Sequence, residues 1–333
     1  LSSCLPTEIL DHICCDIASP SDLFPLLLTN SVVHPIAARV LYRDLVNLSK
    51  TQTVHLLQSL SKPPHPSNDK YLPSRHDFVK NLEINFDDCT LLMSLLTMVR
   101  QTLERLPNLK SLLIEFSSSD NRRPLARFFP LNAPFKLRYL TTSVRYDPEL
   151  AMFLNAQPEI QDLSLRGFQT TGEFKLNPDA LPNLRSFRSV HTGPSVISQM
   201  ITGRPVEAMS LSLYPDDSPE LLDTLNLPST KIKRLTLLMI DCASPYNLFQ
   251  QLSSRLPDLI ALHIVALGVD YNMVDLFECA TTLSTFNNLQ YLTYMVSGPP
   301  ATIAQEALLA VKWAAACPTL RTIILPRGKV WYQ

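Results

Sequence analysis

The sequence is poor in glycine, poor in charge and free of long hydrophobic runs. Only 7 of its 333 residues are Gly, and 18% are charged. So few glycines argue against folds built on glycine-rich phosphate-binding loops. No apolar stretch approaches the ~18 residues of a membrane-spanning helix, so we expect no membrane segment. The net charge of −1 gives no overall field that would favour nucleic acid as a partner.

Seven cysteines are scattered along the chain, and most lie in apolar stretches. An odd number in such positions predicts the buried, reduced thiols of a cytoplasmic and/or nuclear protein rather than a disulfide framework. His12, Cys14 and Cys15 lie close together, but on a helix residue 14 points away from the face that 12 and 15 share. No second pair with zinc-like spacing follows, so we expect no metal site.

Motifs of the common enzyme classes are also absent. The sequence has no G-x-S-x-G, no Walker loop and no H-E-x-x-H. We therefore expect no catalytic residue and no cofactor. A Cys–His nucleophile pair stays open as an alternative, because such a pair meets only in space.

Leucine and proline are abundant, and their spacing is periodic. One pattern recurs ten times: an apolar residue, two others, an apolar residue, one other, and usually a third apolar residue. The copies start 22 to 31 residues apart. The first residues of the copies are Val79, Leu109, Leu137, Ile160, Leu184, Val206, Ile232, Leu259, Leu289 and Leu320.

Proline stands two residues before the first apolar residue in five copies, where it ends one element and releases the chain into a strand. Between the strands we expect helices over 91–105, 148–156, from 219, over 245–252, 270–285 and 301–316. One strand and one helix cannot bury both apolar faces, so neighbouring copies must stack with parallel strands inside and helices outside. The alternative, a doubly wound α/β domain, usually has five to eight strands and a Gly-rich first turn.

This pattern resembles leucine-rich repeats over residues 79–326. The resemblance implies an α/β solenoid with parallel strands inside and helices outside. It departs from the family at the residue eight positions after the first Leu, which is usually Asn or Cys. That position holds Phe168, Tyr214, Ile240 or Leu267 in four copies. We therefore expect no internal asparagine ladder and irregular curvature.

The first 45 residues have a different pattern. Apolar residues at 9, 10, 13 and 17 make one face of a helix. Ser21 or Asp22 can cap a second helix, and a third is expected over 31–43 with Pro35 near its first turn. Three short helices are a thin basis for independent stability, so the module is expected to bury apolar surface against something else.

These residues resemble an F-box, most closely those of fungal F-box proteins with irregular leucine-rich repeats. The match rests on Leu5-Pro6, Glu8-Ile9-Leu10, Ile13 and Ile17, Asp22-Leu23, and the closing Leu41-Tyr42. The resemblance implies docking to the Skp adaptor of Skp–cullin–F-box ubiquitin ligases. The residues that it assigns to adaptor docking and module packing together are Leu5, Pro6, Ile9, Leu10, Ile13 and Leu23. The alternative is that these helices only cap the solenoid.

The predicted organisation has three parts. Residues 1–45 form the F-box-like helical module, and 46–78 an atypical first repeat with a Pro-rich loop. Residues 79–333 form the irregular solenoid. Within the middle part, a first strand and helix are expected over 44–60 and a polar loop over 61–76.

Residues two, four and six positions past each first apolar residue should point to the open face of the sheet. Those singled out as candidate substrate contacts are Tyr139, Arg166, Arg188, Arg234, His263 and Tyr291. Asp162 lies on the same face. Tyr and Arg are common interface anchors, and the three arginines suggest a cationic patch for an acidic or phosphorylated segment. Dispersed solubilising charge is the alternative.

The sequence therefore predicts a non-enzymatic substrate receptor that binds a Skp adaptor, a cullin ligase assembly and a protein substrate, but neither nucleic acid nor membrane. The alternative is a leucine-rich-repeat scaffold with no ligase role. An enzyme with a site on loops at one sheet edge is a third possibility.

Overall fold

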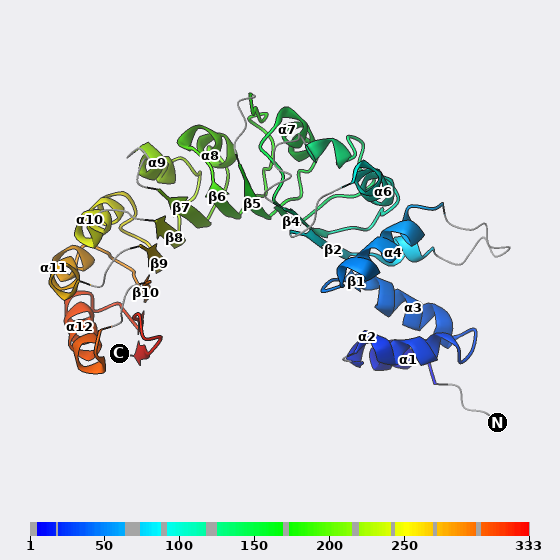
Figure 1. The fold of residues 1–333 in the computed structure, drawn as a ribbon. Helices are drawn as coiled ribbons and strands as arrows, with labels where there is room; N and C mark the ends of the chain where they lie inside the picture. Colours follow the sequence, from blue (N-terminus) through cyan, green and yellow to red (C-terminus); the bar gives the residue numbers. More distant parts are fainter. Residues whose placement is uncertain are drawn as a thin grey trace. The chain divides into compact units, whose positions relative to one another are not determined.

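The structure is a computed structural model that describes residues 5–17, 19–63, 74–87, 92–117, 125–168, 173–214, 220–240, 244–268, 272–297 and 301–332. It forms two compact units, Leu1–Ile160 and Gln161–Gln333. Strands and helices follow one another along both (Figure 1). The chain is α/β, and in each unit successive strands lie side by side, an order compatible with a solenoid-like fold.

The first unit opens with three helices. They are α1 (Thr7–Asp16), α2 (Pro20–Leu27) and α3 (Val33–Arg43). The predicted cap at Ser21 or Asp22 is wrong, because Ser19 occupies the N-cap position and Pro20 begins the helix. Proline suits that first position, since its φ angle is already helical and its missing N–H would have no partner there. Cys14, Leu23 and Ala37 form the module's fully buried core.

The rest of the first unit alternates strands with helices. Its elements are β1 (Asp44–Leu45), α4 (Lys50–Leu60), α5 (Arg75–Phe78), β2 (Asn81–Phe86), α6 (Met93–Leu103), β3 (Ser111–Phe116), η2 (Leu125–Phe128), β4 (Tyr139–Thr142) and α7 (Pro148–Asn155). The four strands pair in parallel and in sequence order. The strand and helix expected over 44–60 are present, and most of the loop expected over 61–76 lies outside the described residues.

The second unit continues the alternation. Its elements are β5 (Asp162–Phe168), β6 (Ser186–His191), α8 (Pro194–Ile201), β7 (Ala208–Leu213), α9 (Glu220–Asp223), η3 (Thr224–Asn226), β8 (Arg234–Ile240), α10 (Pro245–Arg255), β9 (Ala261–Leu267), α11 (Met273–Leu283), β10 (Tyr291–Val296), α12 (Ile303–Ala316), β11 (Thr322–Ile324) and β12 (Val330–Tyr332). Strands β5 to β11 pair in parallel, and β12 turns back antiparallel to β11. Its helices lie on one side of the strands (Figure 1).

Each of the ten periodic copies contains a strand. Each of these ten strands, β2 to β11, begins two residues after the first apolar residue of its copy. A repeated hydrogen-bond pattern explains the offset. The N–H groups of Lys110 and Ser111 both donate to the carbonyl of Lys80, at 2.8 and 3.0 Å. Arg234 and Lys233 share the Glu207 carbonyl in the same way. Regular strand pairing begins with the second of the two donor residues, Ser111 or Arg234.

Two connections between parallel strands lack a described α-helix, and a buried polar side chain supports each. In the first unit, Gln157 accepts a hydrogen bond from the N–H of Leu137 at 2.8 Å and donates to the carbonyl of Phe135 at 3.4 Å. In the second unit, the Arg204 guanidinium donates to the carbonyls of Ala180 and Gln199, each at 2.6 Å. Both side chains are buried. They satisfy backbone groups that a helix would have satisfied itself.

Candidate functional site

The N-terminal module exposes much of its apolar material. Ile9 and Ile13, one turn apart on α1, are 45% and 48% exposed. Leu5 and Pro6 are exposed as well, and Leu10 is half-buried. These five residues therefore border the surface of the module, with Ile9 and Ile13 forming an exposed pair beside the half-buried Leu10.

Leu23, the sixth predicted docking residue, has a different place. It is 3% exposed and packs in the core of the module. Its role in this structure is to hold α2 against its neighbours. The sequence could not separate the two roles, because Leu23 and Phe24 are both large, apolar and adjacent on one helix.

Sequence reasoning missed three exposed apolar residues. Phe24 is 56% and Leu28 88% exposed, and Val32 is exposed as well. Phe24 and the C-cap residue Leu28 are four residues apart, so they lie on the same side at the end of α2. The continuous apolar run in this part of the chain concealed the division between core and surface. We call the exposed set of Leu5, Ile9, Ile13, Phe24, Leu28 and Val32 the module surface.

Polar contacts fix the helices that carry the module surface. Asp11 on α1 forms an ion pair with Arg39 on α3. His34 Nδ1 is 2.8 Å from the carbonyl of Leu27 at the end of α2. Burial raises the pKa of the Cys14 thiol, as does the neighbouring Cys15, so Cys14 stays protonated. The module is thus a fixed apolar surface without an activated nucleophile at this buried thiol.

The predicted substrate contacts lie on strands of both units. Tyr139 begins β4 in the first unit and is exposed. In the second unit, Arg166 is on β5, Arg188 on β6 and Arg234 on β8, all exposed. The buried residues of these strands alternate with the exposed ones, so the arginines share the sheet face that the helices leave open. We call it the open face.

The three arginines do not form one row. Arg188 pairs in register with Ser164 and Ser210, whereas Arg234 pairs with Ala208 and Ala261. Each therefore lies at a different height along its strand. The arrangement is a diagonal across the open face, and the nearest register partners are small.

His263 and Tyr291 lie farther along the open face, on β9 and β10. His263 Nδ1 is 2.9 Å from Oγ1 of Thr293, and burial lowers the pKa of its imidazole. Tyr291 begins β10 and is exposed. His263 is therefore a neutral, hydrogen-bonded residue at neutral pH, and Tyr291 offers a ring to a partner.

A stack of three rings, which the sequence reasoning did not foresee, lies at the ends of β5, β6 and β7. The rings of Phe168 and His191 are stacked with centroids 4.3 Å apart, and those of His191 and Tyr214 are 5.5 Å apart. The Tyr214 hydroxyl and His191 Nδ1 share a hydrogen bond of 2.6 Å. Two of these rings occupy the position where leucine-rich repeats usually carry Asn, and that substitution was the available signal.

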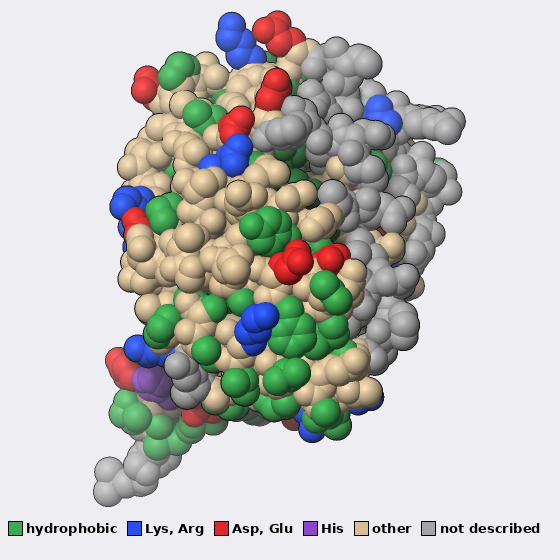
Figure 2. All heavy atoms as spheres, turned by 90° about the vertical axis from the view of Figure 1, so that its left-hand side faces the viewer, with side chains coloured by type: hydrophobic (Ala, Val, Ile, Leu, Met, Phe, Trp, Pro, Cys, Tyr) green, Lys and Arg blue, Asp and Glu red, His purple; other side chains and the backbone are tan. Residues whose placement is uncertain are grey.

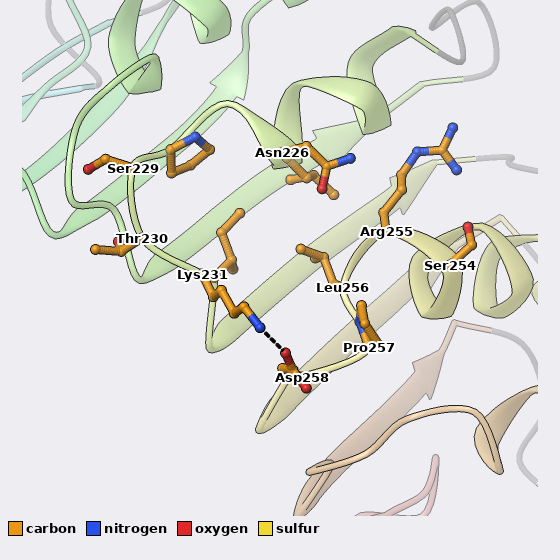
Figure 3. Close-up of a pocket in the computed structure, with 12 residues that line it drawn as sticks. Asn226, Ser229, Thr230, Lys231, Ser254, Arg255, Leu256, Pro257 and Asp258 are labelled. Atoms are coloured by element: carbon orange, nitrogen blue, oxygen red, sulfur yellow. Dashed lines mark hydrogen bonds and ion pairs between the residues drawn. The ribbon is translucent and has the colours of Figure 1, made fainter.

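A hollow of about 420 Å³ lies where the chain enters β8 and β9 (Figure 3). Lys231 Nζ points across it to Oδ2 of Asp258, 2.5 Å away, and Nδ2 of Asn287 donates to the other carboxylate oxygen. These contacts lower the pKa of Asp258. The charges of Lys231 and Asp258 therefore compensate each other within the hollow. The described residues that line it include neither His nor Cys. We assign no chemistry to this hollow.

A further exposed apolar area, separate from the module surface, lies at the end of the second unit. Leu308 and Val311 on α12 are 60% and 67% exposed, and Tyr332 on β12 is exposed as well. Hydrophobic side chains gather in the lower half of the view onto this side (Figure 2). It serves below as a reference surface with exposed aliphatic residues outside the N-terminal module.

Within the described ranges, no group of three or more His, Cys, Asp or Glu residues could hold a metal ion. No helix in the same ranges is both long and apolar enough to cross a membrane. No model of a known protein family matches the chain. No curated protein matches it significantly either.

Proposed function

We propose that this chain is a substrate-recognition adaptor of a Skp–cullin–F-box ubiquitin ligase. The N-terminal helices would bind the Skp adaptor, and the open face would hold a protein substrate. Ubiquitin transfer would be performed by partner subunits, so the chain itself needs no catalytic residue or cofactor. Such an adaptor would act in the cytoplasm or nucleus, with neither nucleic acid nor membrane as a partner.

The observation that carries this proposal is the imbalance within the module. Six large apolar side chains are exposed, while three residues form the fully buried core. Covering a side chain of this size contributes about 1.5–3 kcal/mol. A partner that covers the module surface would therefore gain substantial affinity, and exposed patches of this kind mark interaction sites.

The repeats support the proposal that the open face holds a protein substrate. Their strands follow the apolar pattern of leucine-rich repeats, and solenoids of this type offer an extended open face for binding. The order of the parts, with a docking module before a binding array, suits a receptor that joins a substrate to a ligase.

One observation favours a different function, a protein-binding scaffold whose first helices are only a cap. The carbonyl of Arg43, at the end of α3, accepts a hydrogen bond from the N–H of Lys80 at 3.0 Å. The chain then enters β1 at the next residue, Asp44. The third helix is thus continuous with the first repeat, as a cap would be.

Co-purification with a Skp adaptor separates the two functions. The test variant is the double substitution Ile9→Asp and Ile13→Asp. Both residues are exposed, so the free chain should keep its fold, whereas two charges in a covered apolar interface should weaken binding at least about 100-fold. Leu10→Asp is a poorer choice, because Leu10 is half-buried and its loss would also disturb the module.

The matched control is Leu308→Asp with Val311→Asp, which places the same charges on exposed positions of α12. The control should bind the Skp adaptor as well as the wild type. Equal binding by the wild type and the Ile9/Ile13 variant would contradict the proposal. So would a folded wild type that binds no Skp adaptor, and the scaffold function would then stand.

A further inference from the structure

The stack of Phe168, His191 and Tyr214 continues as an apolar stripe. Ile240 ends β8 and Leu267 ends β9, and the two pair in register. Tyr214 and Ile240 each follow the register pair Leu213 and Met239, so they are neighbours as well. The five residues thus occupy the ends of five successive strands, and we call them the strand-end stripe.

The strand-end stripe presents rings and aliphatic groups to solvent. Phe168 is 40% exposed and Leu267 is 38% exposed, while the three residues between them are half-buried. Stacking holds the Phe168 and His191 rings in place before any partner arrives, which reduces the entropy lost on binding. The stripe is therefore a fixed apolar track and not a set of independent side chains.

Positive charge lies beside this track. Arg166 precedes Phe168 by two residues on β5, and Arg188 precedes His191 by three on β6. Among the described residues, Arg188 has no ion-pair partner, and Asp162 is the sole carboxylate on the open face of β5 to β11. Arg234 begins β8, six residues before Ile240, so it lies away from the strand-end stripe. An anionic partner on the stripe would therefore meet the uncompensated guanidinium group of Arg188.

We propose that the strand-end stripe and the arginines beside it bind an extended acidic peptide segment of the substrate that carries at least one aromatic or aliphatic anchor. This inference rests on the proposed receptor function and specifies its substrate. Neighbouring strands lie ~4.8 Å apart, so the five strand ends span roughly 19 Å. An extended peptide covers that distance with about six residues.

A single-stranded nucleic acid would also use rings and cations, but the surface favours a peptide. Ile240 and Leu267 offer aliphatic groups with no ring to stack on a base. The chain as a whole carries a net charge of −1. It therefore has no overall positive field to attract a long phosphate backbone.

Selection from a displayed library of random octapeptides tests the inference on the full chain. The peptides enriched on the wild type should contain Asp or Glu together with Phe, Tyr, Leu or Ile. A fluorescein-labelled copy of the most enriched peptide then serves as the probe in anisotropy titrations. Enrichment of neutral or basic peptides, or of none at all, would overturn the inference.

Two variants locate the site. Arg166→Glu with Arg188→Glu reverses the charge beside the stripe, and Phe168→Ser removes the exposed ring. Each should weaken probe binding about tenfold or more. The matched control is Glu83→Lys on β2 of the first unit, which should change the affinity less than about twofold. Unchanged binding in both site variants would overturn the inference, as would tighter binding of a poly-thymidine oligonucleotide than of any selected peptide.

Failure of this inference is distinguishable from failure of the receptor function. The charge-reversed variant should still co-purify with the Skp adaptor, because its substitutions lie outside the module. Conversely, Ile9→Asp with Ile13→Asp should still bind the peptide probe. A wild type that binds the Skp adaptor but no acidic peptide would refute the surface assignment while leaving the receptor function intact.

Discussion

The two units carry opposite charges on the same face of their strands. In the first unit, Asp44, Glu83 and Glu115 occupy successive strands. In the second, Arg166 and Arg188 occupy successive strands and Arg234 follows on β8. The inward residues are mostly apolar in both, such as Leu82 and Ile84 on β2 and Leu235 and Leu237 on β8. The fold thus constrains only every second residue of a strand, and the others are free to define binding.

The carboxylates of the first unit are also held differently from the arginines of the second. Although burial opposes it, hydrogen bonds from Arg43 and Asn81 keep the pKa of Asp44 below its usual value. Glu83 accepts a hydrogen bond from the N–H of Asn47 at 3.2 Å. The acidic residues therefore take part in the structure of their unit, whereas Arg188 and Arg234 extend from the surface.

The units resemble each other in how they support a connection between parallel strands that lacks a described α-helix. Gln157 follows α7 and Arg204 follows α8, and each reaches back to the backbone ahead of the preceding strand. One is neutral and the other charged.

Replacing Arg204 should have the largest effect on stability. Arg204→Ala leaves several buried carbonyl groups without donors and should lower the free energy of unfolding of the second unit by about 3 kcal/mol. Both tryptophans of the chain lie in this unit, so urea unfolding followed by tryptophan fluorescence measures the loss. Arg188→Ala on the open face should change it by less than about 0.5 kcal/mol.

Arg204→Lys provides the internal control. The ammonium group is compact and cannot reach the four carbonyls that the guanidinium contacts, so it should recover only part of the lost stability. Burial lowers the pKa of Arg204, which shows that its environment does not favour charge by itself. An Arg204→Ala variant as stable as the wild type would show that the connection is held by packing alone.

Gln157 should matter less, because its hydrogen bonds are uncharged. Gln157→Ala removes one donor and one acceptor from a buried site and should cost about 2 kcal/mol. Circular dichroism during urea unfolding provides the measurement. Gln101→Ala, on the exposed side of α6, should cost less than about 0.5 kcal/mol. A Gln157 variant that loses more stability than Arg204→Ala would reverse the comparison between the units.

The smallest expected effect concerns the start of α7. Asp147 is the N-cap, and its carboxylate accepts a hydrogen bond from the N–H of Leu150 at 2.8 Å. Asp147→Ala should cost about 1 kcal/mol, whereas Asp147→Asn keeps an acceptor. Burial raises the pKa of Asp147, so the folded state binds this proton more tightly than the unfolded state does.

The pH dependence of the Asn variant follows from that raised pKa. The penalty for the charged carboxylate is present at pH 7 and disappears as the pH falls through the folded pKa and below the unfolded value. Asp147→Asn should therefore gain stability relative to the wild type at pH 7 and lose that gain at pH 3. Parallel urea titrations at the two pH values measure it, and a gain that grows on acidification would contradict the assignment.

The order of strands could be predicted from the chain because their apolar residues recur with a fixed spacing. All ten expected strands are present, and the helices over 93–103, 148–155 and 303–316 match expectations closely. Helix α8 was not singled out, although Pro194 begins it. Strand β12 was missed because Val330–Tyr332 lies outside the periodic pattern and pairs antiparallel with β11.

Candidate site residues were harder to assign. The apolar module residues could be recognised from their spacing, but the division between Leu23 in the core and Phe24 at the surface depends on which side of α2 faces α3. Similarly, the arginines could be assigned to the open face by counting residues. Their diagonal arrangement depends on the register between strands, which the spacing within one strand does not contain.

By itself, the sequence determined the alternation of strand and helix, because a buried side chain every second residue is a local property of each segment. Tertiary structure decided which polar side chains support distant backbone, as Arg204 does for Ala180, and which rings stack, as Phe168 and His191 do. The physical reason is that these contacts join residues more than 20 positions apart. Their formation depends on how neighbouring copies stack, and no local pattern specifies that.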